Sequence, residues 1–520
     1  MTDNAQFPDK AAQAVALIAR SIALQQGGEP GAALDCLNAA VNLVPDFPPA
    51  LVKRGTLLLS LAQPCAALAD FERCLEIAPG MAHVMSLKEA AEQAMLVDLA
   101  AHADSASQYC ALAELLARRG RHEEALVNFR QATAIDPEYH AAWNGLGNLL
   151  LHLNRHAEAL VCYETILRFL PNDQIAHFNR GNVLQQQGAY REALASYERA
   201  LKVPPVLAEV MMEQAHCYFA LGDWRRGWPL FESRWQTEQL RHATLQTSAP
   251  AWRGEDAPDG TLLLWAEQGL GDTLQFVRYV HIAASRVAHV VLRVPGSLCS
   301  LLRCVVNEKV SVVAEEEPVP RHDQHCPLMS LPLVLQAFTQ FLPQGVPYLR
   351  SPETTWAKWY ALLGPKSRPR IGLVWAGGQR RLNNPTRDMP LQSLLPLLEF
   401  DAEWFSLQKP LAHDDKALLA LYPQMRCMDA LLIDFADTAA LLNQLDLLIS
   451  VDTAVAHLAG ALGTPTWLIL RKSGEWRWQG RPDDTPWYPH HRLYRQNHFG
   501  EWQMPVGKVM AELPRYFHQI

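Results

Sequence analysis

The stretch Leu262–His281, LLLWAEQGLGDTLQFVRYVH, decides the fold of the second half of the chain. Leu262–Trp265 is a short apolar run without helical spacing, which predicts a buried strand. Gly269 and Gly271 interrupt the run, and Asp272 stands where a helix N-cap is expected. Helical spacing follows, with Arg278 and His281 off the face formed by Leu274, Val277, Val280 and Ile282. Such a unit places backbone N–H groups and a carboxylate at the carboxyl edge of a parallel sheet, where open α/β sheets bind ligands.

Strands and helices alternate beyond this stretch, which predicts parallel sheets. A proline-rich junction near Pro343–Pro369 separates two such halves, so we expect two Rossmann-like domains that face a cleft, residues 260–350 and 365–520. The further strands expected are His289–Val294, Lys309–Val313, a run from Arg370, Trp404–Leu407, Leu447–Val451 and Thr466–Leu470. Helices are expected near Ser297–Val305, Thr438–Leu445 and Thr453–Leu462.

Residues 1–235 contain an internal repeat. Pro45 and Pro79 lie 34 residues apart, and Pro137, Pro171 and Pro205 continue at that interval. Twelve residues before each proline stands an alanine, and eight before it a large apolar residue: Leu37, Phe71, Phe129, Tyr163 or Tyr197. This pattern resembles the tetratricopeptide repeat, in which a small residue lets two helices approach, an aromatic ring fills the groove and proline ends the second helix.

The repeats predict an α-solenoid of about five to six helical hairpins. The period breaks between Pro79 and Ser107, where we expect an extra helix at Ala82–Leu99, and a degenerate last repeat is expected at Met211–Trp235. Solenoids usually offer a concave surface to a partner, and a plain helical spacer is the alternative. Residues 236–259 are polar and predict a linker to the α/β region.

Composition narrows the class of protein. With 49% hydrophobic and 19% charged residues in 520, the chain has enough apolar side chains for real cores. A formal net charge of −8 without a dense basic run argues against nucleic acid as a partner. No apolar run reaches transmembrane length, and the N-terminus lacks the apolar core of a secretory signal. Ten scattered cysteines without a CxxC pair indicate a reducing cytoplasm.

Three stretches of the α/β region carry a more specific resemblance. They are GLGD at residues 269–272, WAGG at residues 375–378 and DTAVAHLAGALGTPTW at residues 452–467. Together they resemble family 9 glycosyltransferases, the heptosyltransferase-like group, over roughly residues 260–515. The resemblance implies a GT-B fold and transfer of a hexosyl or heptosyl group. Repeats fused to such a module are also similar to protein O-GlcNAc transferases, in architecture only.

Two carboxylates are the candidate catalytic groups. The resemblance implies that Asp272 is the base that takes the proton of an acceptor hydroxyl, and a simple helix cap is the alternative. Glu267 precedes the turn and is a second carboxylate within reach of the same edge. Gly269 and Gly271 would let the backbone approach the acceptor.

Donor binding is expected in the second half. Asp452, Thr453, Ala454 and His457 fall on the donor-binding motif of the family, at a strand–helix junction whose N–H groups suit a diphosphate. A mere cap at Asp452–Thr453 and a packed helix histidine are the alternatives. The resemblance also implies a basic residue that offsets the leaving-group charge, for which we favour Arg387 over Arg381. Gln408 and Lys409 are candidate nucleobase or ribose contacts, although a solvated loop explains Lys409 equally well.

Two further groups of residues have competing explanations. His322, His325 and Cys326 have no standard zinc spacing and no evident fourth ligand, so we expect no metal site. The aromatic loop that holds Trp476, Trp478, Trp487 and Tyr488 could stack on a sugar or base, but closure of a domain interface is favoured.

The sequence therefore predicts a cytoplasmic glycosyltransferase with a repeat arm. It would use a nucleotide-diphosphate sugar as co-substrate, without another cofactor or a metal, and invert the anomeric centre. The arm would recruit a protein acceptor or partner on its concave face. One alternative is transfer to lipopolysaccharide or another glycan with the arm as a docking device. The other is a repeat scaffold that binds nucleotide sugar without turnover.

Overall fold

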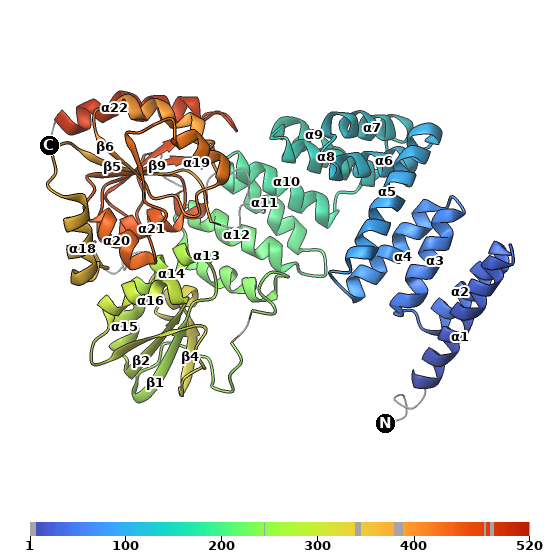
Figure 1. The fold of residues 1–520 in the computed structure, drawn as a ribbon, viewed down its shortest axis with the longest axis horizontal. Coiled ribbons are helices and arrows are strands. Elements are labelled where there is room, and N and C mark those ends of the chain that lie inside the picture. The colour runs from blue at the N-terminus through green and yellow to red at the C-terminus, as the bar shows by residue number, and fades with distance from the viewer. Residues whose placement is uncertain are drawn as a thin grey trace. The chain divides into compact units, whose positions relative to one another are not determined.

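The computed structural model describes residues 7–243, 245–338, 345–378, 388–472, 475–478 and 483–518. The chain divides into two compact units, Met1–Pro171 and Asn172–Ile520. The first is wholly helical, and the second joins the last repeats to an α/β region (Figure 1). A repeat solenoid followed by a parallel α/β region is the predicted fold class, which is thereby confirmed.

The first unit is a row of antiparallel helical hairpins. Four pairs pack closely, α1 with α2, α3 with α4, α6 with α7 and α8 with α9, and α5 is the expected extra helix. Their bounds are α1 Phe7–Gln26, α2 Pro30–Leu43, α3 Pro48–Ser60, α4 Pro64–Ile77, α5 Ala82–His102, α6 Ala106–Arg118, α7 His122–Ile135, α8 His140–His152 and α9 His156–Phe169.

A glycine on one helix of a hairpin admits the aromatic ring of the other. A Cβ on Gly147 would lie 2.8 Å from two ring carbons of Tyr163, and a Cβ on Gly55 2.7 Å from the Phe71 ring. Both rings are fully buried, and the Tyr163 hydroxyl donates to Asn148 Oδ1 at 2.7 Å. Because glycine has no Cβ, the two helices of the hairpin can pack closely around the ring.

We expect Gly147→Ala to destabilise the α8–α9 hairpin by about 1–3 kcal/mol, because its methyl group must displace a close-packed ring. Gly31→Ala is the matched control, since a Cβ at this helical position of α2 meets no atom within 4 Å. Amide hydrogen exchange of the full chain measures both. Exchange in residues 140–169 that is unchanged in Gly147→Ala would contradict this packing account.

The second unit begins with two more hairpins, formed by α10 (Gln174–Gln186) with α11 (Tyr190–Leu201) and α12 (Ala208–Ala220) with α13 (Trp224–Phe231). The α12–α13 pair is the degenerate last repeat expected from the sequence, and the 3-10 helix η1 (Glu232–Gln236) completes it. These repeats belong to the same compact unit as the α/β region, although the sequence repeat ends only at Trp235.

The first sheet of the α/β region has four parallel strands in the order β3-β2-β1-β4. Its strands are β1 Ala257–Trp265, β2 Val287–Val294, β3 Val310–Ala314 and β4 Gln324–Pro327. The sequence analysis missed β4, which is short and carries His325 and Cys326 rather than an apolar run. Its pairing with β1 places it beside the strand that leads into the glycine loop.

The second sheet has six parallel strands in the order β10-β9-β8-β5-β6-β7. They are β5 Arg370–Val374, β6 Glu403–Ser406, β7 Met425–Cys427, β8 Leu447–Ser450, β9 Thr466–Leu470 and β10 His491–Arg495. The helices of the region are α14 Leu270–Phe276, α15 Val280–Ala284, α16 Gly296–Leu302, α17 Leu331–Val334, α18 Glu353–Leu363, α19 His413–Leu419, α20 Phe435–Leu442, α21 Ala454–Leu462 and α22 Gln503–His518.

One apolar core joins the last repeat to both halves of the α/β region. It includes Phe219 of α12, Trp228 of α13, Leu264 of β1 and Ala459 of α21. A second core lies between the other face of the second sheet and α22. None of the described helices is long and apolar enough to cross a membrane.

Two segments expected to be plain connections carry structure. In the linker, Trp252 is buried, and its backbone N–H donates to the His325 carbonyl at 2.8 Å. The junction between the halves contains α18, whose buried Trp359 donates from Nε1 to Asp437 Oδ1 at 2.8 Å. A single tryptophan thus anchors each segment against the neighbouring core.

Candidate active site

The glycine loop runs from the end of β1 into α14. Gly269 is the N-cap of α14 in extended backbone, and its N–H donates to Asp272 Oδ2 at 2.9 Å. Asp272 is therefore the third residue of the helix, and the prediction that it is the N-cap itself was wrong. Its side chain still caps the helix by reaching back, which fixes one carboxylate oxygen and leaves the other for another partner.

The loop also meets the donor motif of the second half. A Cβ on Gly271 would lie 2.8 Å from His457 Cδ2 and 3.6 Å from the Ala454 Cα, so only glycine fits between the two elements. Helices α14 and α21 pack against each other along this contact. The structure thus brings together two of the candidate stretches, although they lie in different halves of the α/β region.

The donor motif begins at the carboxyl end of β8. Thr453 is the N-cap of α21, which begins one residue after the expected start, and its hydroxyl lies 3.2 Å from Ser450 Oγ. Asp452 and Thr453 are both buried, and Ala454 is the first residue of the helix. The N–H groups of this first turn carry the positive end of the helix dipole, which suits an anion.

His457 is held inside the protein. Its Nδ1 lies 3.0 Å from the Tyr488 hydroxyl, its Nε2 lies 3.9 Å from Asp452 Oδ1, and its ring stacks on Trp478 at 5.1 Å. The packed-histidine alternative describes this arrangement, and donor contact by His457 stays a prediction.

Arg477 is the residue that the sequence analysis missed. It lies in the 3-10 helix η8 (Trp476–Trp478), and its guanidinium forms an ion pair with Asp272 and hydrogen-bonds to Gln275. It also forms an ion pair with Glu475, and its guanidinium carbon lies 4.2 Å from the Trp476 ring centroid. The only local signal was an arginine between two tryptophans, which an interface and a ligand contact explain equally well.

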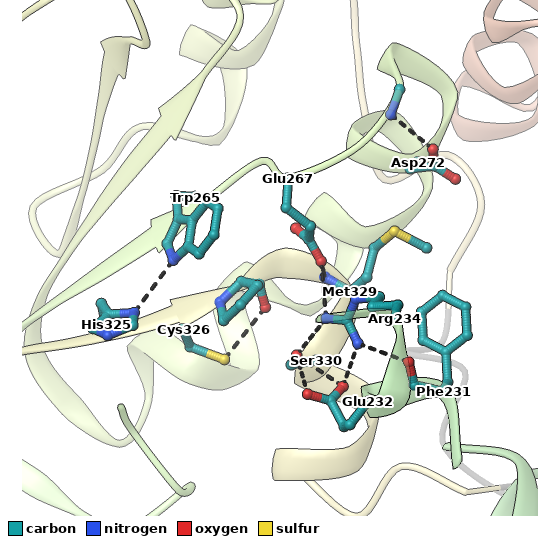
Figure 2. Close-up of polar contacts among 12 residues, drawn as sticks. Phe231, Glu232, Arg234, Trp265, Glu267, Asp272, His325, Cys326, Met329 and Ser330 are labelled. Atoms are coloured by element: carbon teal, nitrogen blue, oxygen red, sulfur yellow. Dashed lines mark hydrogen bonds and ion pairs between the residues drawn. The ribbon is translucent and has the colours of Figure 1, made fainter. Parts of the chain in front are cut away.

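Glu267 is buried behind the loop rather than exposed at its edge. Its side chain is 1% exposed, and Oε1 accepts from Met329 N at 3.1 Å and from Arg234 at 3.2 Å (Figure 2). Arg234 is 0% exposed and donates further to Ser330 Oγ at 2.6 Å. Because Arg234 follows the last repeat helix, this cluster connects the repeats to the strand end that carries the loop, and we interpret Glu267 as a positioning residue.

Burial raises the pKa of Glu267 to about 7, although the Arg234 guanidinium and the Met329 N–H oppose the shift. The unfolded chain therefore releases this proton at lower pH than the folded chain, and the contribution of Glu267 to stability declines as the pH rises to about 7.

We expect Glu267→Gln to remove this decline in stability with rising pH. Relative to the parent, the free energy of unfolding of the variant should rise by about 3 kcal/mol between about pH 5 and about pH 8. Denaturation followed by tryptophan fluorescence measures it, since every tryptophan except Trp143 lies in the second unit. Parallel pH dependence of parent and variant would show that Glu267 stays ionised throughout.

Of the other candidate donor-binding residues, Gln408 and Lys409 form hydrogen bonds within the protein. Gln408 is buried and accepts from the backbone N–H of Trp375 and Ala376, at 3.2 and 3.0 Å. It therefore supports the WAGG turn, and Lys409 donates to the Leu432 carbonyl. Arg381 and Arg387 lie outside the described residues.

The residues of both groups with competing explanations make contacts within the protein. His322 Nε2 lies 2.8 Å from Thr247 Oγ1, and His325 Nδ1 lies 3.4 Å from Trp265 Nε1. Among the described residues, no cluster of His, Cys, Asp and Glu could hold a metal ion. The aromatic loop closes an interface, as favoured: Trp476 lies 4.6 Å from the Phe219 ring and Trp487 lies 4.6 Å from Trp224.

The same closure buries Arg278, which was expected to lie off the apolar face. Its guanidinium donates to the Trp487 carbonyl at 3.3 Å and lies 4.7 Å from the Tyr348 ring centroid. Arg278 is thus buried although it lies off that face, because the aromatic loop packs against it.

Comparison with known proteins finds family matches both in the repeats and in the α/β region. Residues 116–178 and 175–203 match tetratricopeptide repeat families, and residues 415–500 match glycosyltransferase family 9 (heptosyltransferase). The chain combines tetratricopeptide repeats with a family 9 glycosyltransferase domain. The match to the glycosyltransferase family contains Asp452 and Thr453 of the donor motif, and also His457 and Arg477, which contact the glycine loop.

Individual proteins are similar over parts of the chain. Protein FlbA of Caulobacter vibrioides is 26% identical over an alignment of 337 residues that covers 60% of this chain and 56% of that protein. The chain thus spans about half the length of this curated relative. YrrB, a TPR protein with an unusual peptide-binding site, is 18% identical, with 38% of this chain and 90% of that chain covered and a TM-score of 0.22. For PilF of Pseudomonas aeruginosa the identity is 15%, the coverage 44% and 94%, and the TM-score 0.26.

Proposed function

We propose that the glycosyltransferase domain transfers a sugar from a nucleotide-diphosphate donor to an acceptor hydroxyl with inversion. The observation that carries the proposal is the contact of the Asp272 loop with the donor motif, where Gly271 packs directly on His457. The acceptor oxygen would attack the anomeric carbon as the bond to the diphosphate breaks, and Asp272 would take the acceptor proton. Both reacting partners would then meet at one junction between α14 and α21.

Charge on the leaving diphosphate needs compensation in this reaction. The first turn of α21 offers N–H groups, and Arg381 or Arg387 remains our candidate basic residue beyond the described part of the chain. We propose that these protein groups act without a metal ion or another cofactor. The nucleotide sugar is thus a co-substrate, and a cytoplasmic location would supply it.

The repeats are proposed to recruit a protein acceptor or partner, since tetratricopeptide repeats mediate protein–protein contacts. Transfer to lipopolysaccharide or another glycan is the alternative acceptor. A non-catalytic scaffold also has one observation in its favour, because Asp272 is bound to the Arg477 cation rather than free to take a proton.

The test is transfer by the purified full chain from a panel of uridine, guanosine, adenosine and cytidine diphosphate sugars. Extract from cells that lack the protein supplies the acceptors, divided into protein and lipopolysaccharide fractions, and mass spectrometry detects the added sugar. A sugar on a hydroxyl side chain supports the protein acceptor, and a sugar in the glycan fraction supports the alternative. Donor binding without transfer or hydrolysis in either fraction would favour the scaffold.

A further inference from the structure

Arg477 links the candidate base to the donor side of the site. Its side chain is 7% exposed, whereas the Asp272 side chain that it contacts is 22% exposed. The neighbouring Trp478 stacks on His457 of α21, so η8 lies against the donor helix as well as against the glycine loop. A buried cation next to the ring that stacks on His457 therefore contacts the glycine loop.

The carboxylates around Arg477 keep it charged. Burial lowers the pKa of Arg477, but Glu475, Asp272 and Asp452 raise it by more, so the net shift is upward. The Arg477 guanidinium contacts Asp272 Oδ1, and the Gly269 N–H donates to Oδ2, so both carboxylate oxygens are engaged. In this arrangement Asp272 is therefore poorly placed to remove a hydroxyl proton.

The two carboxylates that pair with Arg477 are held differently. Glu475 belongs to the same loop and also accepts the Arg477 backbone N–H, at 3.1 Å to Oε2, so it accompanies the arginine. Asp272 comes from the other half of the α/β region, and its Oδ2 is fixed by the Gly269 N–H while Oδ1 contacts Arg477. The contact through Oδ1 is thus the one that another anion could replace.

We propose that the donor diphosphate replaces Asp272 as a partner of Arg477, which frees the aspartate to act as base. The inference rests on the proposed function. The Asp272 contact uses one guanidinium nitrogen, Nη2, and a phosphate oxygen can accept from that nitrogen as a carboxylate oxygen does, so the exchange keeps Arg477 paired. The acceptor proton then goes to Oδ1, and the negative diphosphate leaves against Arg477. Asp272 becomes competent only once donor is bound, which predicts that donor binds before acceptor.

The test measures pyrophosphate binding by calorimetry to the parent, Asp272→Asn, Arg477→Gln and the double variant. Pyrophosphate is the probe because it is the part shared by all nucleotide-diphosphate donors. We expect Asp272→Asn to bind it about tenfold more tightly than the parent, since Arg477 loses its competing anion. Arg477→Gln should bind about tenfold more weakly, and adding Asp272→Asn to Arg477→Gln should bring no further gain.

Several results would overturn the proposal that the diphosphate replaces Asp272 at Arg477. The same gain from Asp272→Asn with and without Arg477 would reduce the effect to removal of a nearby negative charge. Unchanged affinity in Asp272→Asn, or no binding to the parent at millimolar pyrophosphate, would also contradict it. Arg477→Lys guards against misfolding, because it keeps the charge without the fork and should bind with intermediate affinity.

Failure of the proposed function gives a different signature. If the protein is not a transferase, no nucleotide sugar is turned over, whatever pyrophosphate does. If only the exchange is wrong, transfer persists, and product inhibition patterns show random rather than donor-first binding.

Discussion

Asp272→Asn is expected to lower the turnover of sugar transfer about a hundredfold or more while the fold survives. Asparagine is nearly the same size, and its carbonyl oxygen can still accept the Gly269 N–H that Asp272 accepts at 2.9 Å. It has no carboxylate to take a proton. The measurement is transfer at saturating donor, with the acceptor found by mass spectrometry.

Asp434→Asn is the matched control for this substitution. Asp434 caps α20 by accepting from Ala436 N at 2.8 Å, so it has a capping role without the candidate chemistry. We expect its turnover to stay within a few-fold of the parent. The same small change in Asp272→Asn would show that Asp272 is only a cap and would leave the base unassigned.

Trp228→Ala should destabilise the second unit by about 3–5 kcal/mol, the usual range for deletion of a large buried ring. Trp228 is fully buried in α13, and its ring centroid lies 4.6 Å from Phe219, 5.8 Å from Phe276 and 5.9 Å from Trp476. These rings come from the last repeat, the helix of the glycine loop and the loop of Arg477. The variant should therefore lose transferase activity at temperatures where the parent is stable.

Trp356→Ala is the control, because Trp356 on α18 is 38% exposed and its ring stacks only on the exposed Tyr360 among the ring contacts described. Trp356→Ala should lower the free energy of unfolding by well under half as much as Trp228→Ala does. Denaturant unfolding followed by the remaining tryptophans reports both variants. Equal effects would mean that the aromatic cluster contributes no more than a surface ring.

Most elements of the fold could be predicted from local sequence patterns. The 34-residue period predicted the helical hairpins, its interruption predicted the extra helix α5, and the alternation of strands and helices predicted that both sheets are parallel. Short elements without an apolar run escaped detection, as β4 did with its His325 and Cys326. Such a strand is defined by its pairing with β1, and pairing leaves no periodic signal in the strand itself.

The site was predictable only in part, for the same reason. Residue types and glycines identified the loop at Gly269–Asp272 and the helix start at Thr453. The partner of Asp272 lies 205 positions away in the sequence, at Arg477, and no local spacing connects them. The pairing of Glu267 with Arg234 was likewise hidden, because it depends on how the last repeat packs against the strand end.

The division after Pro171 has a consequence for exchange of modules between proteins. A graft that joins a foreign solenoid at residue 236 would discard Phe219 and Trp228, which pack against the aromatic loop, and Arg234, which pairs with Glu267. A graft at residue 172 would retain them. The last two hairpins thus belong structurally to the glycosyltransferase domain, and the part of the arm that could be exchanged ends where the first unit ends.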